Sequence, residues 1–165
     1  MRRQHKFYET PRKPWDKLRI EQENKLMKEY GLKRKREIWR AEAILRNFRR
    51  QARELAGMPG ESTRKEILIG KLNRLGILPT NATLDDILAL EINNILDRRL
   101  QTLVFKKGLA KTPKQARQFI VHGHISVNGR IVKWPSFLVP TELENKISFS
   151  KKKEQILTKI VKGEI

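Results

Sequence analysis

The stretch ARQFIVHGHISVNGRIV, residues 116–132, decides the fold of the C-terminal half of this chain. Its first residues have apolar side chains at helical spacing, and we expect the helix to end at Gly123. Beyond it the pattern switches to a period of two residues over 124–127 and 130–133, which is typical of strands. Asn128-Gly129 separates these runs and favours a type I′ turn. The stretch therefore predicts a helix followed by an antiparallel hairpin.

The residues on either side extend this pattern. Residues 91–107 are predicted to form one helix. A second helix is expected to begin after Thr112, with Pro113 in its first turn and Gln115 at the capping-box position. A further strand is predicted over 146–149.

The N-terminal half is predicted to be a basic arm followed by helices. Pro11 and Pro14 disfavour regular structure in residues 1–14, and a helix is expected from Asp16 to Gly31. The clearest helix of the chain then ends at Gly57. Its apolar stripe, at alternating steps of three and four, is Ile38, Ala41, Leu45, Phe48, Ala52 and Leu55.

Two capping-box pairs predict further helices, one opening at Thr63 with Glu66 and one at Thr83 with Asp86. The predicted fold class is α+β. A basic arm and helical domain occupies 1–97, two helices packed on a β-hairpin with further short antiparallel strands occupy 98–150, and a basic tail follows over 151–165.

Charge is distributed unevenly along the chain. There are 37 Lys and Arg against 18 Asp and Glu, a formal net charge of +19 in 165 residues. Residues 98–140 contain nine basic side chains and no acidic one, whereas 58–97 contain four basic and six acidic. Folded surfaces usually intersperse both signs. The acid-free segment is therefore expected to face a polyanion, with nucleic acid the first candidate and a membrane surface the weaker alternative.

No residues with catalytic or metal-binding spacing are found in the sequence. It has no cysteine, and its three histidines do not have metal-ligand spacing. Neither a nucleophile elbow nor a glycine-rich phosphate loop is present. Asp85 and Asp86 are interpreted as helix-capping residues. The N-terminus lacks a signal-peptide core and no apolar run is long enough to span a membrane, so we expect an intracellular protein that is not an enzyme and has no cofactor.

The basic and amide side chains of 98–133 are predicted to lie on one surface. Steps of three and four place several on one face of each predicted helix, and the others flank the hairpin. These candidates are Arg99, Thr102, Lys106, Lys114, Arg117, Gln118, His122, His124, Arg130 and Lys133. A solvated lysine face is the simpler alternative, but the missing carboxylates and the choice of Arg and Gln favour phosphate contact. The aromatic residues Trp15, Trp39, Phe105, Trp134 and Phe137 are expected in the core or an interface.

These residues also resemble a known family. The run RRLQTLVFKKGLAKTPKQARQFIVHGHISVNGRIVKWPSFLVP, residues 98–140, resembles the RNA-binding domain named after ribosomal protein S-four. ETPRKPW, residues 9–15, and KREIWRAEAILRNFRRQAREL, residues 35–55, resemble the N-terminal region of its archaeal and eukaryotic type. Together they cover most of residues 1–150, and the tail beyond about 150 resembles nothing in that family.

The resemblance implies a structural protein of the cytoplasmic small ribosomal subunit and a primary binder of its ribosomal RNA. It implies nucleation of subunit assembly, contact with ribosomal protein S-five at a surface linked to decoding accuracy, a place near the messenger RNA entry path, and no homo-oligomer. Carried over by position, the RNA face would comprise Arg99, Lys106, Lys114, Arg117, His122, His124, Asn128 and Arg130. A separate part of the RNA would contact basic side chains in and just before the long N-terminal helix, namely Lys33, Arg34, Lys35, Arg36, Arg40, Arg46, Arg49, Arg50 and Arg53. Asn128 has a competing explanation, because the turn itself needs a positive φ there.

Three alternatives stay open at this point. An RNA-modifying or synthetase enzyme could carry such a domain as an appendage, but no catalytic domain is visible beside it. A DNA-binding regulator could use residues 95–121 as a helix–turn–helix, although basic side chains occur on both helices. A free-standing RNA-binding regulator could use the same basic surface.

Overall fold

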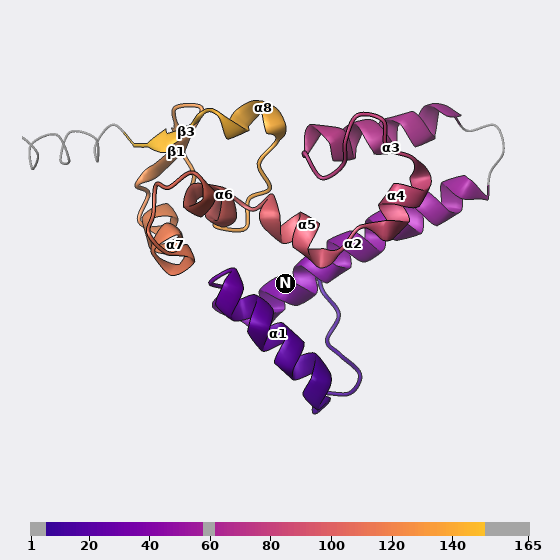
Figure 1. Ribbon diagram of the computed structural model, residues 1–165, viewed down its shortest axis with the longest axis horizontal. Coiled ribbons are helices and arrows are strands. Elements are labelled where there is room, and N and C mark those ends of the chain that lie inside the picture. Colours follow the sequence, from indigo (N-terminus) through magenta and orange to yellow (C-terminus); the bar gives the residue numbers. More distant parts are fainter. Residues whose placement is uncertain (1–5, 58–61, 151–165) are drawn as a thin grey trace, which may run out of the picture. The chain divides into compact units, whose positions relative to one another are not determined.

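A computed structural model describes residues 6–57 and 62–150 (Figure 1). The chain divides between Asp97 and Arg98 into two compact units. The predicted tail over 151–165 lies outside the described residues. Residues 6–14 of the predicted arm contain neither helix nor strand. The predicted limits of the RNA-binding domain, 98–150, stay a prediction.

The first unit is built around one long helix, α2, Lys35–Ala56. The other helices, α1 (Lys17–Glu29), α3 (Ser62–Arg74), α4 (Leu84–Ala89) and α5 (Ile92–Asp97), all contact it (Figure 1). The contacts form because α2 buries the predicted apolar stripe: Ile38, Ala41, Leu45, Phe48 and Ala52 are buried. The prediction of this helix is therefore confirmed.

A buried carboxylate joins α1 to α2. Glu23 of α1 is only 3% exposed. Its Oε1 accepts hydrogen bonds from Arg19 Nη1 at 2.5 Å and Trp39 Nε1 at 3.0 Å, and its Oε2 lies 3.0 Å from Lys35 Nζ. Burial raises the pKa of Glu23, but the hydrogen bonds from Trp39, Lys35 and Arg19 outweigh it and hold the pKa below its ordinary value.

Glu23→Gln is expected to lower the free energy of unfolding at pH 7 by about 2 kcal/mol, less than for a fully buried pair because both cations are partly exposed. Since the folded pKa is lowered, the stabilisation is complete above the unfolded value of about 4.3 and is lost as pH falls through the folded pKa. Denaturant titrations at a series of pH values from 7 down to about 2 measure this. Glu42→Gln is the control and should raise the free energy of unfolding at pH 7 instead of lowering it. Burial and the charge of Glu23 raise the pKa of Glu42, so its charged form is unfavourable in the folded state. Equal stability of wild type and Glu23→Gln at pH 7 would contradict the assignment.

The second unit packs helices against a small antiparallel sheet. Its helices are α6 (Leu100–Lys106), α7 (Pro113–Val121) and α8 (Thr141–Glu144), and its strands are β1 (Ile125–Val127), β2 (Arg130–Ile131) and β3 (Ile147–Phe149) in the order β2-β1-β3. Ser126 pairs with Ile131 on one side and Ser148 on the other. The core includes Leu100, Val104, Ala116, Ile120, Ile125, Val127, Val139 and Ile147. The α+β class, the hairpin and the strand near 146–149 are confirmed.

Two predictions about helices are wrong. Residues 91–107 form two helices, because the backbone around Arg99 is extended (φ −71°, ψ 142°) and bridges Leu138. Leu100 N donates to Phe137 O at 2.7 Å, and Val139 N donates to Arg98 O at 3.0 Å. Thr63 lies within α3, which begins at Ser62, and so does not cap it. The Thr83 cap is confirmed, since Thr83 N donates to Asp86 Oδ2 at 2.7 Å.

The hairpin turn has the backbone that its sequence predicts. Asn128 and Gly129 have φ values of +50° and +76°, the only described positive values besides four glycines. Both residues of a type I′ turn need such values, and an asparagine tolerates them better than other non-glycine residues. The turn therefore accounts for Asn128 without any ligand.

Gly129→Val is expected to lower the free energy of unfolding by at least about 1–2 kcal/mol, because a β-branched residue is strained at positive φ. A Cβ at this position would meet no neighbouring atom, so the loss reports backbone strain alone. Gly70→Ala in α3 is the matched control: its Cβ also meets open space, but helix propensity there should raise stability by about 0.5–1 kcal/mol. Thermal melts measure both, and an unchanged Gly129→Val melting temperature would refute the turn.

Candidate nucleic-acid interface

One cation of α7, Arg117, contacts a buried amide. Arg117 is half-buried, and its Nη1 lies 3.4 Å from Oε1 of Gln101 on α6. Gln101 is buried and donates from Nε2 to the Pro113 carbonyl at 3.0 Å, which holds it at the start of α7. Lys114 is exposed one turn before Arg117. The α6–α7 contact therefore presents Arg117 with part of its side chain already immobilised.

The turn between α7 and the hairpin gathers both histidines. The rings of His122 and His124 stack with centroids 6.1 Å apart and planes at 17°. Nε2 of Gln118 lies 3.0 Å from Nε2 of His122. Gly123 between them has a φ of +73°, and a Cβ there would lie 3.4 Å from Cε of Lys133. The positive φ favours glycine at this position, and the aliphatic part of Lys133, two residues after β2, lies close to the histidine turn.

Of the predicted cations, Lys114, His122, Arg130 and Lys133 are exposed and Arg117 and His124 are half-buried. We call these six residues the α7–hairpin surface, and that they share one RNA-binding face stays a prediction. The structure brings His122, His124 and Lys133 together as the sequence predicts. Two imidazoles and several Lys or Arg side chains, with the neighbouring amide of Gln118, can donate hydrogen bonds to phosphate oxygens.

The predicted face of Arg99, Thr102 and Lys106 does not form. Arg99 is only 4% exposed and precedes α6, and Thr102 is also buried. The cause is the bridge to Leu138, which ends the regular helix before Arg99 and turns its side chain inward. Lys106 is exposed at the end of α6 and stays a candidate.

The aromatic residues divide between core and surface. Phe137 packs against the core of the second unit, and Trp39 is half-buried beside Glu23. Trp15 and Trp134 are 90% and 70% exposed, and Phe105 is also exposed, so these three are not in the core and an interface position stays a prediction for them. Trp134 directly follows Lys133.

A second cationic surface lies on α2, which we call the α2 surface. A hollow of about 350 Å³ is lined by Glu9, Ala43, Arg46, Asn47, Arg50 and Arg53. Arg46 pairs with Glu9, and Arg50 Nη2 donates to Asn47 Oδ1 at 3.1 Å. Asn47 was not among the residues predicted from the sequence, although its position one helical turn before Arg50 in the arginine-rich helix was an available signal.

Two further cations among the predicted N-terminal contacts are half-buried against structural partners. Arg49 is half-buried and donates from Nη2 to the carbonyl of Leu90, the residue after α4. Lys35 pairs with the buried Glu23. Lys33, Arg34, Arg36 and Arg40 are exposed near the start of α2. Contact of any of these residues with RNA stays a prediction.

Residues 6–57 and 62–150 include no group of three acidic, histidine or cysteine side chains placed to hold a metal ion. Within the same ranges no helix is both long and apolar enough to cross a membrane.

The chain is similar to known proteins over most of its length. The model of the S4 domain matches residues 98–144. The chain is 55% identical over 152 residues to the small ribosomal subunit protein uS4 of Picrophilus torridus, covering 89% of this chain and 83% of that protein. It is 57% identical over 151 residues to that of Methanococcus aeolicus, covering 90% and 85%. It is 54% identical over 153 residues to that of Nanoarchaeum equitans, covering 90% and 85%.

Proposed function

Because the chain belongs to the uS4 family of small ribosomal subunit proteins, we propose that it is a structural component of that subunit and binds its ribosomal RNA. The α7–hairpin surface and the α2 surface each contact a part of this RNA. The role is that of a scaffold in the cytoplasmic ribosome and involves no catalysis.

The observation that carries the proposal is the acid-free segment. Residues 98–140 contain nine cations and no carboxylate, and they fold into helices and a hairpin that leave most of these cations exposed. Folded RNA is recognised mainly through phosphates and 2′-hydroxyls, because the A-form major groove is too narrow to read. Neutralising about eight phosphates would give a slope of log K against log salt of roughly −6 to −7.

The family resemblance extends the proposal to partners. The protein binds early, nucleates assembly of the subunit body, contacts ribosomal protein S-five in a way that affects decoding accuracy, and lies near the messenger RNA entry path. Omitting this chain from a reconstitution tests these points. We expect later proteins of the subunit body to fail to bind, and S-five to bind more weakly. Normal assembly without the chain would contradict them.

Competition between ribosomal RNA fragments and duplex DNA tests the choice of nucleic acid. At about 150–200 mM salt, where non-specific contacts weaken, RNA fragments should compete strongly and duplex DNA poorly. Equal competition by both would instead favour a general nucleic-acid-binding regulator.

Arg117→Ala is expected to weaken RNA binding and to reduce the salt slope by about one unit without unfolding the protein. Arg117 is half-buried, so truncation removes a guanidinium that Gln101 already orients. Filter binding across a salt series measures both quantities. Lys25→Ala, an exposed lysine of α1 outside both surfaces, is the control with the same charge change. An unchanged affinity and slope for Arg117→Ala would remove it from the interface.

A further inference from the structure

We propose that a hollow between α2 and α3 binds one unpaired nucleotide of the RNA, with its base against apolar side chains and its phosphate on the flanking cations. The inference rests on the proposed function because it needs an RNA partner. It concerns a hollow outside the α2 surface and the α7–hairpin surface, whose α3 residues come from the segment with no cationic excess.

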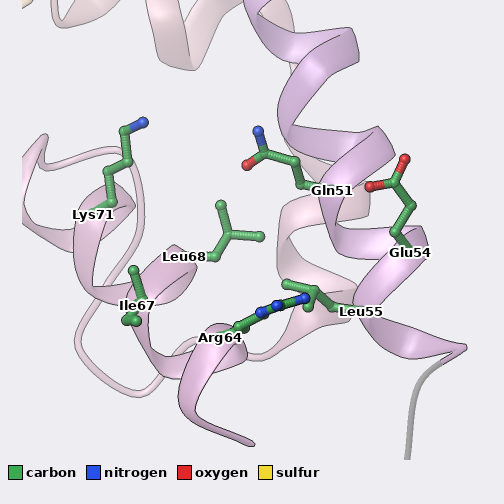
Figure 2. A pocket seen from close by; sticks show the side chains of 7 residues that line it. All are labelled: Gln51, Glu54, Leu55, Arg64, Ile67, Leu68 and Lys71. Atoms are coloured by element: carbon green, nitrogen blue, oxygen red, sulfur yellow. The ribbon is translucent and has the colours of Figure 1, made fainter. Parts of the chain in front are cut away.

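The hollow has a defined lining from both helices. Its volume is about 360 Å³, within the range of about 300–1,000 Å³ of small-ligand sites. Figure 2 shows α2 on one side and α3 on the other. The lining residues are Gln51, Glu54 and Leu55 from α2, and Arg64, Ile67, Leu68 and Lys71 from α3.

The floor of the hollow is apolar and partly open to water. Leu68 is buried, Leu55 is half-buried, and Ile67 is 66% exposed in the middle of a helix. Its side chain therefore leaves apolar surface in contact with water beside the buried Leu68. If the flat face of a base covered these side chains, apolar surface of both the base and the protein would be removed from water.

Polar groups lie at the edges of this floor in positions that suit a nucleotide. In Figure 2 Gln51 extends from α2 into the space between the helices, and Arg64 and Lys71 lie toward opposite ends. An amide both donates and accepts, so Gln51 can pair with a base edge. Arg64 and Lys71 can bind phosphate oxygens. Glu54 lies at the rim with its Oε1 3.9 Å from Arg50 Nε, which offsets its negative charge.

A protein segment fits this hollow less well. An amphipathic helix docks through anchors at i, i+3, i+4 and i+7 along an extended groove. Here the apolar lining is short: Ile67 and Leu68 are adjacent on α3, and Leu55 lies opposite them on α2. The flanking cations are complementary to a phosphate.

A photo-crosslinking experiment on assembled subunits tests the inference. The full chain with Ile67→p-benzoylphenylalanine is reconstituted into small subunits and irradiated. We expect an adduct with one unpaired nucleotide of the ribosomal RNA. Glu66→p-benzoylphenylalanine is the matched control, one residue away, exposed and outside the hollow, and should give markedly less of that adduct. An adduct with another protein, or none, would overturn the inference. Failure of the chain to enter subunits would overturn the proposed function and this inference with it.

A binding experiment separates the base contact from charge. Ile67→Asp should weaken binding to an RNA hairpin with one bulged nucleotide by roughly fivefold more than to the fully paired hairpin, the lower end of what one base contact contributes. Gly70→Asp adds the same charge on the same helix, where a Cβ meets open space. Gly70→Asp should weaken binding to both hairpins equally. If Ile67→Asp lowered the affinity for both hairpins equally, this would contradict a base in the hollow.

Discussion

Changing Arg46, Arg50 and Arg53 together to alanine is expected to weaken ribosomal RNA binding about a hundredfold. Each guanidinium lines the hollow of the α2 surface. At about 1 kcal/mol for each exposed phosphate contact, three contacts sum to about 3 kcal/mol, or roughly two decades in affinity. The slope of log K against log salt should fall by roughly two to three units, because three fewer counterions are displaced. Electrophoretic mobility shifts over a salt series measure both quantities.

The control for this triple variant is a second triple with the same change in net charge. Lys17, Lys25 and Lys28 lie on α1 and are exposed, and none of them lines the hollow of the α2 surface. Changing these three to alanine should alter affinity much less. An equal loss in both variants would show that only total charge matters, and would contradict a defined RNA surface on α2.

Ile120→Ala is expected to unfold most of the second unit at physiological temperature. Ile120 on α7 is fully buried among Val104, Ile125 and other core residues. Truncating such a side chain to alanine lowers the free energy of unfolding by about 3 kcal/mol, because apolar burial is lost and a cavity is left behind. A unit of this size has little stability in reserve, because small domains bury a limited fraction of their surface. Two-dimensional NMR of the full chain should lose the resonances of residues 98–150 and keep those of α2.

Val121→Ala is the matched control for Ile120→Ala. It is the next residue on the same helix, but its side chain is exposed. It should leave the spectrum and RNA affinity nearly unchanged. Intact resonances of the second unit in Ile120→Ala would show that this core does not depend on α7.

Local signals predicted the parts of the fold that local chemistry determines. The Asn128-Gly129 turn and the apolar stripe of α2 need no information from distant residues, and both are confirmed. The break between α5 and α6 is different. It arises because residues 98–100 pair with residues 137–139, about forty positions away. Sequence periodicity continues through the break, so helix propensity alone could not place it.

The candidate interface was predictable in composition but less so in detail. Arg49 and Arg50 are adjacent in an arginine-rich helix, and about 100° of rotation separates them. Arg49 caps the end of α4, whereas Arg50 lines the hollow of the α2 surface. Only the position of α4 distinguishes the two. The burial of Arg99 likewise follows from a tertiary bridge that no local pattern encodes.

The pairing of Arg98 with the residues near Val139 holds the beginning of the second unit against a segment close to its end. Arg98 Nη1 also lies 2.8 Å from Oε2 of Glu144 in α8, and its Nη2 donates to the Val139 carbonyl at 2.9 Å. Because these contacts join the beginning of the unit to a later segment of the same unit, the two segments stay together without support from the rest of the chain. In evolution such a domain can therefore be joined to other polypeptides at a single position while its hydrophobic core stays unchanged.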